Sequence, residues 1–283
     1  MSLRVVEDSV PQAAEKAGRV PPAAEKASRA PPAAEKASRA PQGGTARQAP
    51  RGTTPLLVML PGAGHGADDF VRAGFIAELR ERNLQVDVLA VDAHSHFYLD
   101  KSIVTRLHEE VIAPALVARP APASLWLLGI SLGGMGASLY ARAHPGTVAG
   151  LVLLAPFFAV RGTIAEVTRA GGLAQWQPGA VAADDEERLL LQWLKAYRAD
   201  MPADMPGDSS AGLANAAPAI RLGYGTNDRY APASSLLEAR LPAAQVATVA
   251  GGHDWDTWIV LWRQLLDRGL FAGSEKELAA CPK

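Results

Sequence analysis

The chain has 283 residues, 48% of them hydrophobic, and its 28 lysines and arginines nearly balance its 29 aspartates and glutamates. This near-neutral charge argues against nucleic acid as the main partner, because phosphate binding requires a clustered basic excess. The single cysteine, Cys281, excludes an internal disulfide framework and a cysteine-based zinc site.

The first fifty residues differ in composition from the rest of the chain. Residues 11–40 hold three near-copies of a ten-residue unit, PQAAEKAGRV, PPAAEKASRA and PPAAEKASRA, and a fourth copy dissolves after Gln42. These units lack the large apolar residues that stack solenoid repeats, and the proline at each boundary stops a helix. We therefore expect residues 1–50 to form a disordered tail, with a weak electrostatic tether to acidic partners as the alternative.

Targeting signals are not evident in the sequence. The start, MSLRVVEDSVPQ, has no apolar signal-peptide core, and no later stretch reaches the roughly 18 uncharged apolar residues of a membrane span. We expect a cytoplasmic protein without a membrane-spanning segment.

From Pro55 onward, short apolar strands alternate with amphipathic helices. Apolar runs bounded by turn residues predict buried strands at 56–60, 86–91, 125–129, 151–155, 220–224 and 245–249. Apolar residues at helical spacing predict helices at 68–82, 101–117, 132–143 and 255–266. This alternation predicts one α/β domain over residues 51–283, with a mostly parallel, doubly wound sheet and helices on both faces.

One long segment, residues 157–218, interrupts the alternation. It contains an acidic run, 184–187, followed by an apolar stripe that includes Leu190, Trp193 and Tyr197, a pattern typical of a helix with acidic residues in its first turn. We interpret the segment as a small helical cap over the functional site, because a long insertion in a compact domain is often functional. An ordinary packed helix is the alternative.

The strongest chemical signal is the motif Gly129-Ile130-Ser131-Leu132-Gly133, which lies between a predicted strand and a predicted helix. This context is typical of a nucleophile elbow, in which glycines allow a sharp turn that exposes the serine. The helix amino terminus also favours the negative charge that develops during acyl transfer. We therefore predict Ser131 as a catalytic nucleophile; a tight turn without chemistry is the alternative.

A serine nucleophile requires a base and an acid that orients it. His253 follows the last predicted strand, and Asp228 follows the strand at 220–224, so both loops reach the same edge of a parallel sheet. We predict His253 as the base and Asp228 as the acid. Asp254 is the rival acid, but its position at a helix start favours an N-cap role.

The glycine-rich loop 61–66 predicts donors for an oxyanion. The backbone amides of Leu132 and Ala63 are the candidates, with Gly64 as the alternative to Ala63. A phosphate-binding loop is the competing interpretation, but no Lys-Ser/Thr follows the glycines and the spacing is not GxGxxG.

These motifs carry a family resemblance. The elbow GISLGGMGA, the loop LPGAGH, the acid loop GTND and the histidine loop GGHDW together resemble the α/β-hydrolases over about 55–270. GGHDWDTW resembles the histidine loop of bacterial serine esterases of the esterase D and enterochelin-esterase type. The resemblance implies an α/β-hydrolase fold and hydrolysis of small or medium carboxylic esters through an acyl-serine, without a cofactor. Thioesterase, amidase or acyltransferase activity, or a non-catalytic binding module, are the alternatives.

Further candidates for the substrate pocket are His65, His94, His96 and Trp193. Because alternate residues of an extended segment share a face, His94 and His96 could ligate a metal together with Asp92. A fixed set of further ligands is missing from the sequence, so we predict no metal site there.

Overall fold

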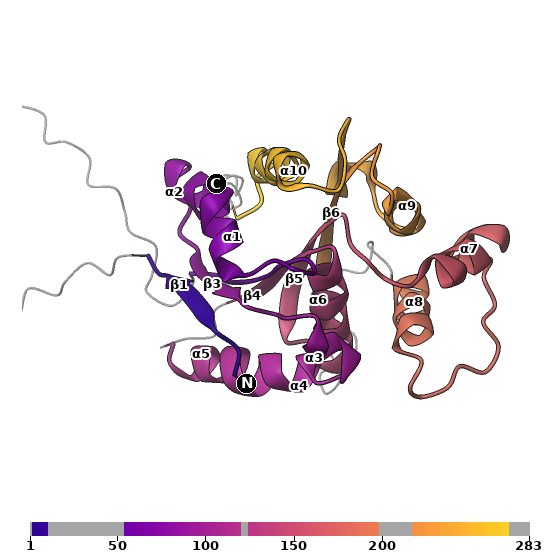
Figure 1. The fold of residues 1–283 in the computed structure, drawn as a ribbon. Coiled ribbons are helices and arrows are strands. Elements are labelled where there is room, and N and C mark those ends of the chain that lie inside the picture. Colours follow the sequence, from indigo (N-terminus) through magenta and orange to yellow (C-terminus); the bar gives the residue numbers. More distant parts are fainter. Residues whose placement is uncertain (1, 11–53, 120–123, 198–216, 272–283) are drawn as a thin grey trace, which may run out of the picture. The chain divides into compact units, whose positions relative to one another are not determined.

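The computed structural model describes residues 2–10, 54–119, 124–197 and 217–271. Within these ranges seven strands form one sheet in the order β1-β3-β2-β4-β5-β6-β7 (Figure 1). The strands are β1 (Val5–Asp8), β2 (Leu56–Leu60), β3 (Asp87–Val91), β4 (Leu125–Ile130), β5 (Val148–Leu154), β6 (Ala219–Gly225) and β7 (Val246–Val249). Neighbouring strands from β3 to β7 are parallel, and β1 is antiparallel to β3.

The six predicted parallel strands are confirmed. Strand β2 shows why they are apolar throughout, since all five of its residues are fully buried. Leu56, Val58 and Leu60 face one hydrophobic core, whereas Leu57 and Met59 face the other, as alternation along a strand requires. The sheet is therefore buried on both faces, which is typical of a doubly wound α/β fold.

Helices lie on both faces of this sheet (Figure 1). One core includes residues of α1 (Ala67–Arg72), α2 (Phe75–Glu81) and α10 (Trp255–Asp267). The other includes residues of α3 (His96–Leu99), α4 (Ile103–Arg106), π-helix η1 (Leu107–Ile112), α6 (Leu132–Ala143), α7 (Arg161–Arg169), α8 (Glu186–Ala196) and α9 (Ala231–Glu238), with α5 (Ala113–Val117) packed against it. A short 3₁₀ turn, η2 (Ala243–Gln245), precedes β7.

Two helices are shorter than their apolar spacing predicted. The helix expected at 68–82 divides into α1 and α2, because Gly74 takes a left-handed conformation with φ of 81° that a continuous helix does not allow. The helix expected at 101–117 begins at Ile103 and passes through the π-helical turn η1 before α5. Both interruptions preserve the apolar face, so periodicity alone does not reveal them.

The segment between β5 and β6 provides α7 and α8. Glu186 and Glu187 lie in the first turn of α8, as the acidic run predicted, and Asp185 caps the helix by accepting a hydrogen bond from the Arg188 amide. Helix α8 contacts α6, and α7 contacts α9. Residues 198–216 of the predicted cap lie outside the described residues, and the cap itself stays a prediction.

The amino-terminal residues differ from the expectation of a tail. Residues 5–8 form β1 and pair with β3, with Val5 opposite Val91 and Asp8 opposite Val88. Leu3 is 9% exposed and contributes to the core, so the expected tail boundary at residue 50 is wrong for these first residues. The repeats at 11–50, predicted to be disordered, lie outside the described residues.

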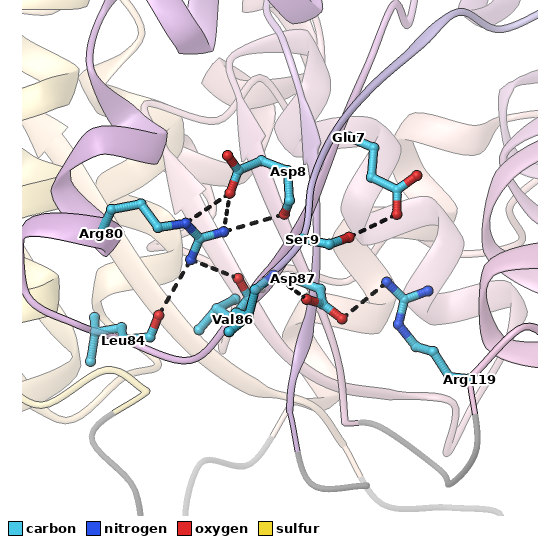
Figure 2. Close-up of polar contacts among 9 residues, drawn as sticks. Glu7, Asp8, Ser9, Arg80, Leu84, Val86, Asp87 and Arg119 are labelled. Carbon is cyan, nitrogen blue, oxygen red and sulfur yellow. Dashed lines mark hydrogen bonds and ion pairs between the residues drawn. The ribbon is translucent and has the colours of Figure 1, made fainter. Parts of the chain in front are cut away.

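Side-chain hydrogen bonds add to the pairing of β1 with β3. Figure 2 shows Arg80 of α2 donating to the carboxylate and the carbonyl of Asp8, and also to the carbonyls of Leu84 and Val86. The Val10 amide donates to Asp87 Oδ1 over 2.9 Å. The Asp87 amide in turn donates to the Pro55 carbonyl, so Val10 and Pro55 both bond to the same residue.

Candidate active site

Ser131 lies at the sharp turn between β4 and α6. Its backbone has φ of 51° and ψ of −116°, a strained conformation for a residue with a side chain. A Cβ on Gly129 would lie 2.3 Å from the Gly133 carbonyl oxygen, and one on Gly133 would lie 2.1 Å from the Leu60 carbonyl oxygen. The two glycines of the motif therefore permit the close backbone approach on which the turn depends.

The backbone around Ser131 is held by hydrogen bonds to neighbouring strands and loops. The Ser131 amide donates to the Leu154 carbonyl over 3.0 Å, and the Ser131 carbonyl accepts from the amides of Gly134 and Phe157, each over 2.9 Å. The serine itself is only 9% exposed. These bonds maintain the strained turn because the surrounding structure satisfies its polar groups.

The structure brings Ser131, His253 and Asp228 together. His253 Nε2 lies 2.9 Å from Ser131 Oγ, and His253 Nδ1 lies 2.7 Å from Asp228 Oδ2. The Asp228 side chain is fully buried, and its other oxygen accepts the Tyr230 amide over 2.7 Å. A buried carboxylate bonded to Nδ1 fixes the imidazole with Nε2 directed at the serine hydroxyl.

Asp254 has a separate structural role. Its side chain accepts the Thr257 amide over 2.9 Å and caps α10, as its sequence position predicted. The cap fixes the start of α10 directly after His253, so it supports the loop that carries the histidine.

The glycine-rich loop 61–66 follows β2 and passes beside the serine. A Cβ on Gly62 would lie 3.3 Å from Ser131 Cβ, and one on Gly66 would lie 2.8 Å from Asp92 Oδ1. Ala63 is exposed in the turn between them, and Leu132 is the first residue of α6, a position whose amide has no partner within the helix. Their role as oxyanion donors stays a prediction.

Asp92, at the end of β3, anchors this loop. Its Oδ1 accepts the Ala67 amide over 2.6 Å, and its Oδ2 accepts Arg4 Nε over 2.7 Å. Burial alone would raise the pKa of the Asp92 carboxyl, but the hydrogen bonds from Ala67 and Arg4 outweigh burial and hold that pKa below its usual value. The side chain considered above as a metal ligand therefore joins the amino-terminal segment to the start of α1.

Aromatic rings surround His253. The Trp258 ring lies edge-on with its centroid 5.0 Å from that of His253, and the Tyr230 ring lies 4.7 Å from His253 and 6.1 Å from Phe157. Trp258 is 2% exposed and belongs to the core, whereas Tyr230 and Phe157 are half-buried. These side chains give the surroundings of His253 an apolar character.

The other predicted pocket residues have different surroundings. His65 lies beside the aromatic rings around His253. Trp255 Nε1 donates to His65 Nδ1 over 3.3 Å, and the His65 ring is 6.3 Å from the Trp258 ring. His94 and His96 stack on each other at 6.0 Å, and Trp193 packs against the core. A role for these four residues in substrate binding stays a prediction.

Sequence reasoning missed Tyr230, Phe157 and the anchoring role of Asp92. Tyr230 and Phe157 follow strand ends, so the same edge argument that selected Asp228 could have included them. No local signal marks the bond between Asp92 and Arg4, which lie 88 positions apart.

Comparison with known proteins identifies the family of the chain. Residues 57–280 match the family described as "Alpha/beta hydrolase family". The chain therefore belongs to the α/β-hydrolase family, and the predicted fold class is confirmed.

Among solved structures, the chain is similar to S-formylglutathione hydrolase from Staphylococcus aureus, at 15% identity over 78% of this chain and 83% of that one, with a TM-score of 0.49. It is also similar to Est1E from Butyrivibrio proteoclasticus, at 17% identity over 76% and 88% of the two chains, with a TM-score of 0.47. No curated protein sequence matches the chain significantly. In the described ranges, no helix is long and apolar enough to cross a bilayer.

Proposed function

We propose that the protein is a serine hydrolase that cleaves small or medium carboxylic esters through an acyl-serine intermediate. The observation that carries this proposal is the continuous hydrogen-bonded series from Ser131 Oγ through His253 to Asp228, at 2.9 and 2.7 Å. Nucleophile, base and orienting acid have the mutual geometry that acyl transfer requires.

The reaction proceeds in two halves. Ser131 Oγ attacks the ester carbonyl carbon while His253 Nε2 takes the hydroxyl proton, and His253 then gives that proton to the leaving oxygen as the carbon–oxygen bond breaks. Water repeats the attack on the acyl-serine, losing its proton to His253, which returns it to Ser131 as the acid product departs. Asp228 stabilises the imidazolium that forms in each half.

The amides of Leu132 and Ala63 would donate to the oxyanion of each tetrahedral intermediate. One well-placed donor of this kind contributes about 3–4 kcal/mol to transition-state stabilisation. Every group required is supplied by the polypeptide, so we propose no cofactor, and the partner is a small ester substrate.

The test compares the wild-type protein with Ser131→Ala. We expect the wild type to react with a fluorophosphonate probe and to hydrolyse p-nitrophenyl esters, and the variant to lose both activities while keeping its melting temperature. Equal labelling of the variant would remove Ser131 from its role. Absence of labelling in the folded wild type would instead favour a binding module.

A second set of measurements determines which acyl compounds the protein hydrolyses and whether it transfers the acyl group to an alcohol. Rates on a matched ester, thioester and amide distinguish an esterase from a thioesterase or amidase, and an added alcohol acceptor detects acyl transfer. We expect the ester to be hydrolysed fastest. A p-nitrophenyl series from two to twelve acyl carbons then measures the depth of the acyl pocket.

A further inference from the structure

Arg229 occupies a distinctive position beside the proposed catalytic residues. It follows Asp228 directly in the loop after β6, and its side chain is exposed. Its guanidinium carbon lies 4.8 Å from the centroid of the Tyr230 ring, a cation–π contact that restrains the side chain. That same ring contacts His253 at 4.7 Å.

Among the described residues, no neighbouring carboxylate pairs with the positive charge of Arg229. Within the described residues, Arg229 forms no ion pair, and the adjacent Asp228 is buried and bonded to His253 and Tyr230. The exposed guanidinium of Arg72 differs, since it pairs with Asp69. Arg229 therefore presents its guanidinium to solvent beside the site, with no ion-pair partner in the described part of the chain.

The chemistry of acyl transfer decides which part of a substrate approaches Arg229. His253 must protonate the leaving oxygen, so the leaving group lies alongside the imidazole. Two aromatic rings, those of Trp258 and Tyr230, contact His253. Trp258 is buried in the core, whereas Tyr230 is half-buried and so remains partly accessible. A leaving group on the Tyr230 side of His253 would lie beside the ring that the Arg229 guanidinium contacts.

We propose that Arg229 selects esters whose leaving group carries a carboxylate, an inference that rests on the proposed ester hydrolysis. The planar guanidinium matches the geometry of a carboxylate and can donate two parallel hydrogen bonds to it. The rings of Tyr230 and Phe157 supply an apolar surface for the atoms between the leaving oxygen and that carboxylate.

The test uses two acetyl esters that differ in charge. One is 4-acetoxybenzoate, whose leaving group, 4-hydroxybenzoate, carries a carboxylate, and the other is its neutral match, 4-acetoxybenzamide, which has no second ester. The measured quantity is the ratio of kcat/KM for the anionic ester to kcat/KM for the neutral ester. Differences in intrinsic reactivity cancel when this ratio is compared between wild type and variants.

We expect Arg229→Ala to lower the ratio about five- to tenfold, the effect of losing a partly exposed charge-assisted contact. Arg229→Glu should lower the ratio further, because it reverses the charge. Arg229→Lys should retain part of the wild-type ratio, since lysine keeps the positive charge but lacks the two parallel donors of a guanidinium. The matched control is Arg72→Ala, whose ion-paired guanidinium lies near Trp255, and it should leave the ratio unchanged. Added salt, at about 0.5 M, should lower the wild-type ratio through screening.

An unchanged ratio in both Arg229→Ala and Arg229→Glu would overturn the inference. If Ser131→Ala still abolished hydrolysis in that case, the proposed function would stand. An equal fall of the ratio in Arg72→Ala would also overturn the inference, because the effect would then reflect the overall electrostatic potential of the surface and not a contact with Arg229. If the wild type hydrolyses neither ester and resists fluorophosphonate labelling, the proposed function itself fails and the inference fails with it.

Discussion

Two regions of the sheet, its carboxyl edge and the edge strand β1, differ in how clearly the sequence predicts them. The carboxyl edge, meaning the loops after β2, β4, β6 and β7, carries Gly62, Ser131, Asp228 and His253, each within a short recognisable motif. The edge strand β1 lies in sequence that has no such motif and is held by its pairing with β3 and by the long-range contacts of Arg80 with Asp8. The difference indicates that local backbone demands leave a clear pattern in sequence, whereas a strand added to an edge does not.

The largest expected effect concerns the carboxyl edge. We predict that Asp228→Asn lowers kcat for ester hydrolysis about 10⁴-fold, because an amide no longer fixes the required imidazole tautomer or stabilises the imidazolium. Steady-state rates on a p-nitrophenyl ester measure this, with circular dichroism to verify folding. The matched control is Asp254→Ala, which should lower stability by about 1 kcal/mol through its lost cap while keeping most of the activity. The reverse ranking of these two variants would make Asp254 the orienting acid.

The edge strand should affect stability more than chemistry. Deleting residues 2–10 removes the pairing with β3, the burial of Leu3 and the bonds to Arg80, and we expect the melting temperature to fall by about 10 °C. Differential scanning calorimetry of the two proteins measures the shift. A melting temperature unchanged within about 1 °C would show that β1 contributes nothing to the folded domain.

A smaller effect should depend on pH. The pKa of Asp92 is lowered in the folded protein, so its bonds stabilise the fold above the unfolded value of about 4, and this stabilisation disappears as the pH falls through the folded value. We expect Arg4→Gln to lower the melting temperature by about 1–2 °C at pH 7, since Arg4 is half exposed and the pair is screened. The difference between variant and wild type should shrink as the pH is lowered below about 4. A difference that instead grows toward low pH would contradict the assignment.

The smallest expected effect concerns the residues between β1 and β2. Because Val10 and Pro55 both bond to Asp87, a short chain can connect them, and loop-closure entropy depends only weakly on length. Replacing residues 11–53 with about ten residues of glycine and serine should leave the melting temperature within about 2 °C and ester hydrolysis unchanged. A fall as large as that of the deletion of residues 2–10 would show that the repeats contribute to the fold.

Much of the fold was predictable because the sheet is buried on both faces. A run such as Leu56–Leu60, apolar throughout and bounded by proline, fits a buried parallel strand and is too short for a buried helix. Helix interruptions were not predictable in the same way, since the break at Gly74 leaves the apolar spacing of α1 and α2 intact. The choice of β1 as a strand depends on an edge left open by β3, which no local pattern indicates.

The sequence by itself determined the nucleophile turn, the loops that bring Asp228 and His253 to the carboxyl edge, and the α/β class. It could do so because a strained turn requires glycines at fixed offsets, and parallel strands place their following loops on one side. Only the tertiary structure decided that Ser131 and His253, separated by 122 positions, lie 2.9 Å apart, that Arg4 supports Asp92, and that Arg229 rests on Tyr230. These contacts join side chains whose distances depend on how the elements and loops that carry them pack.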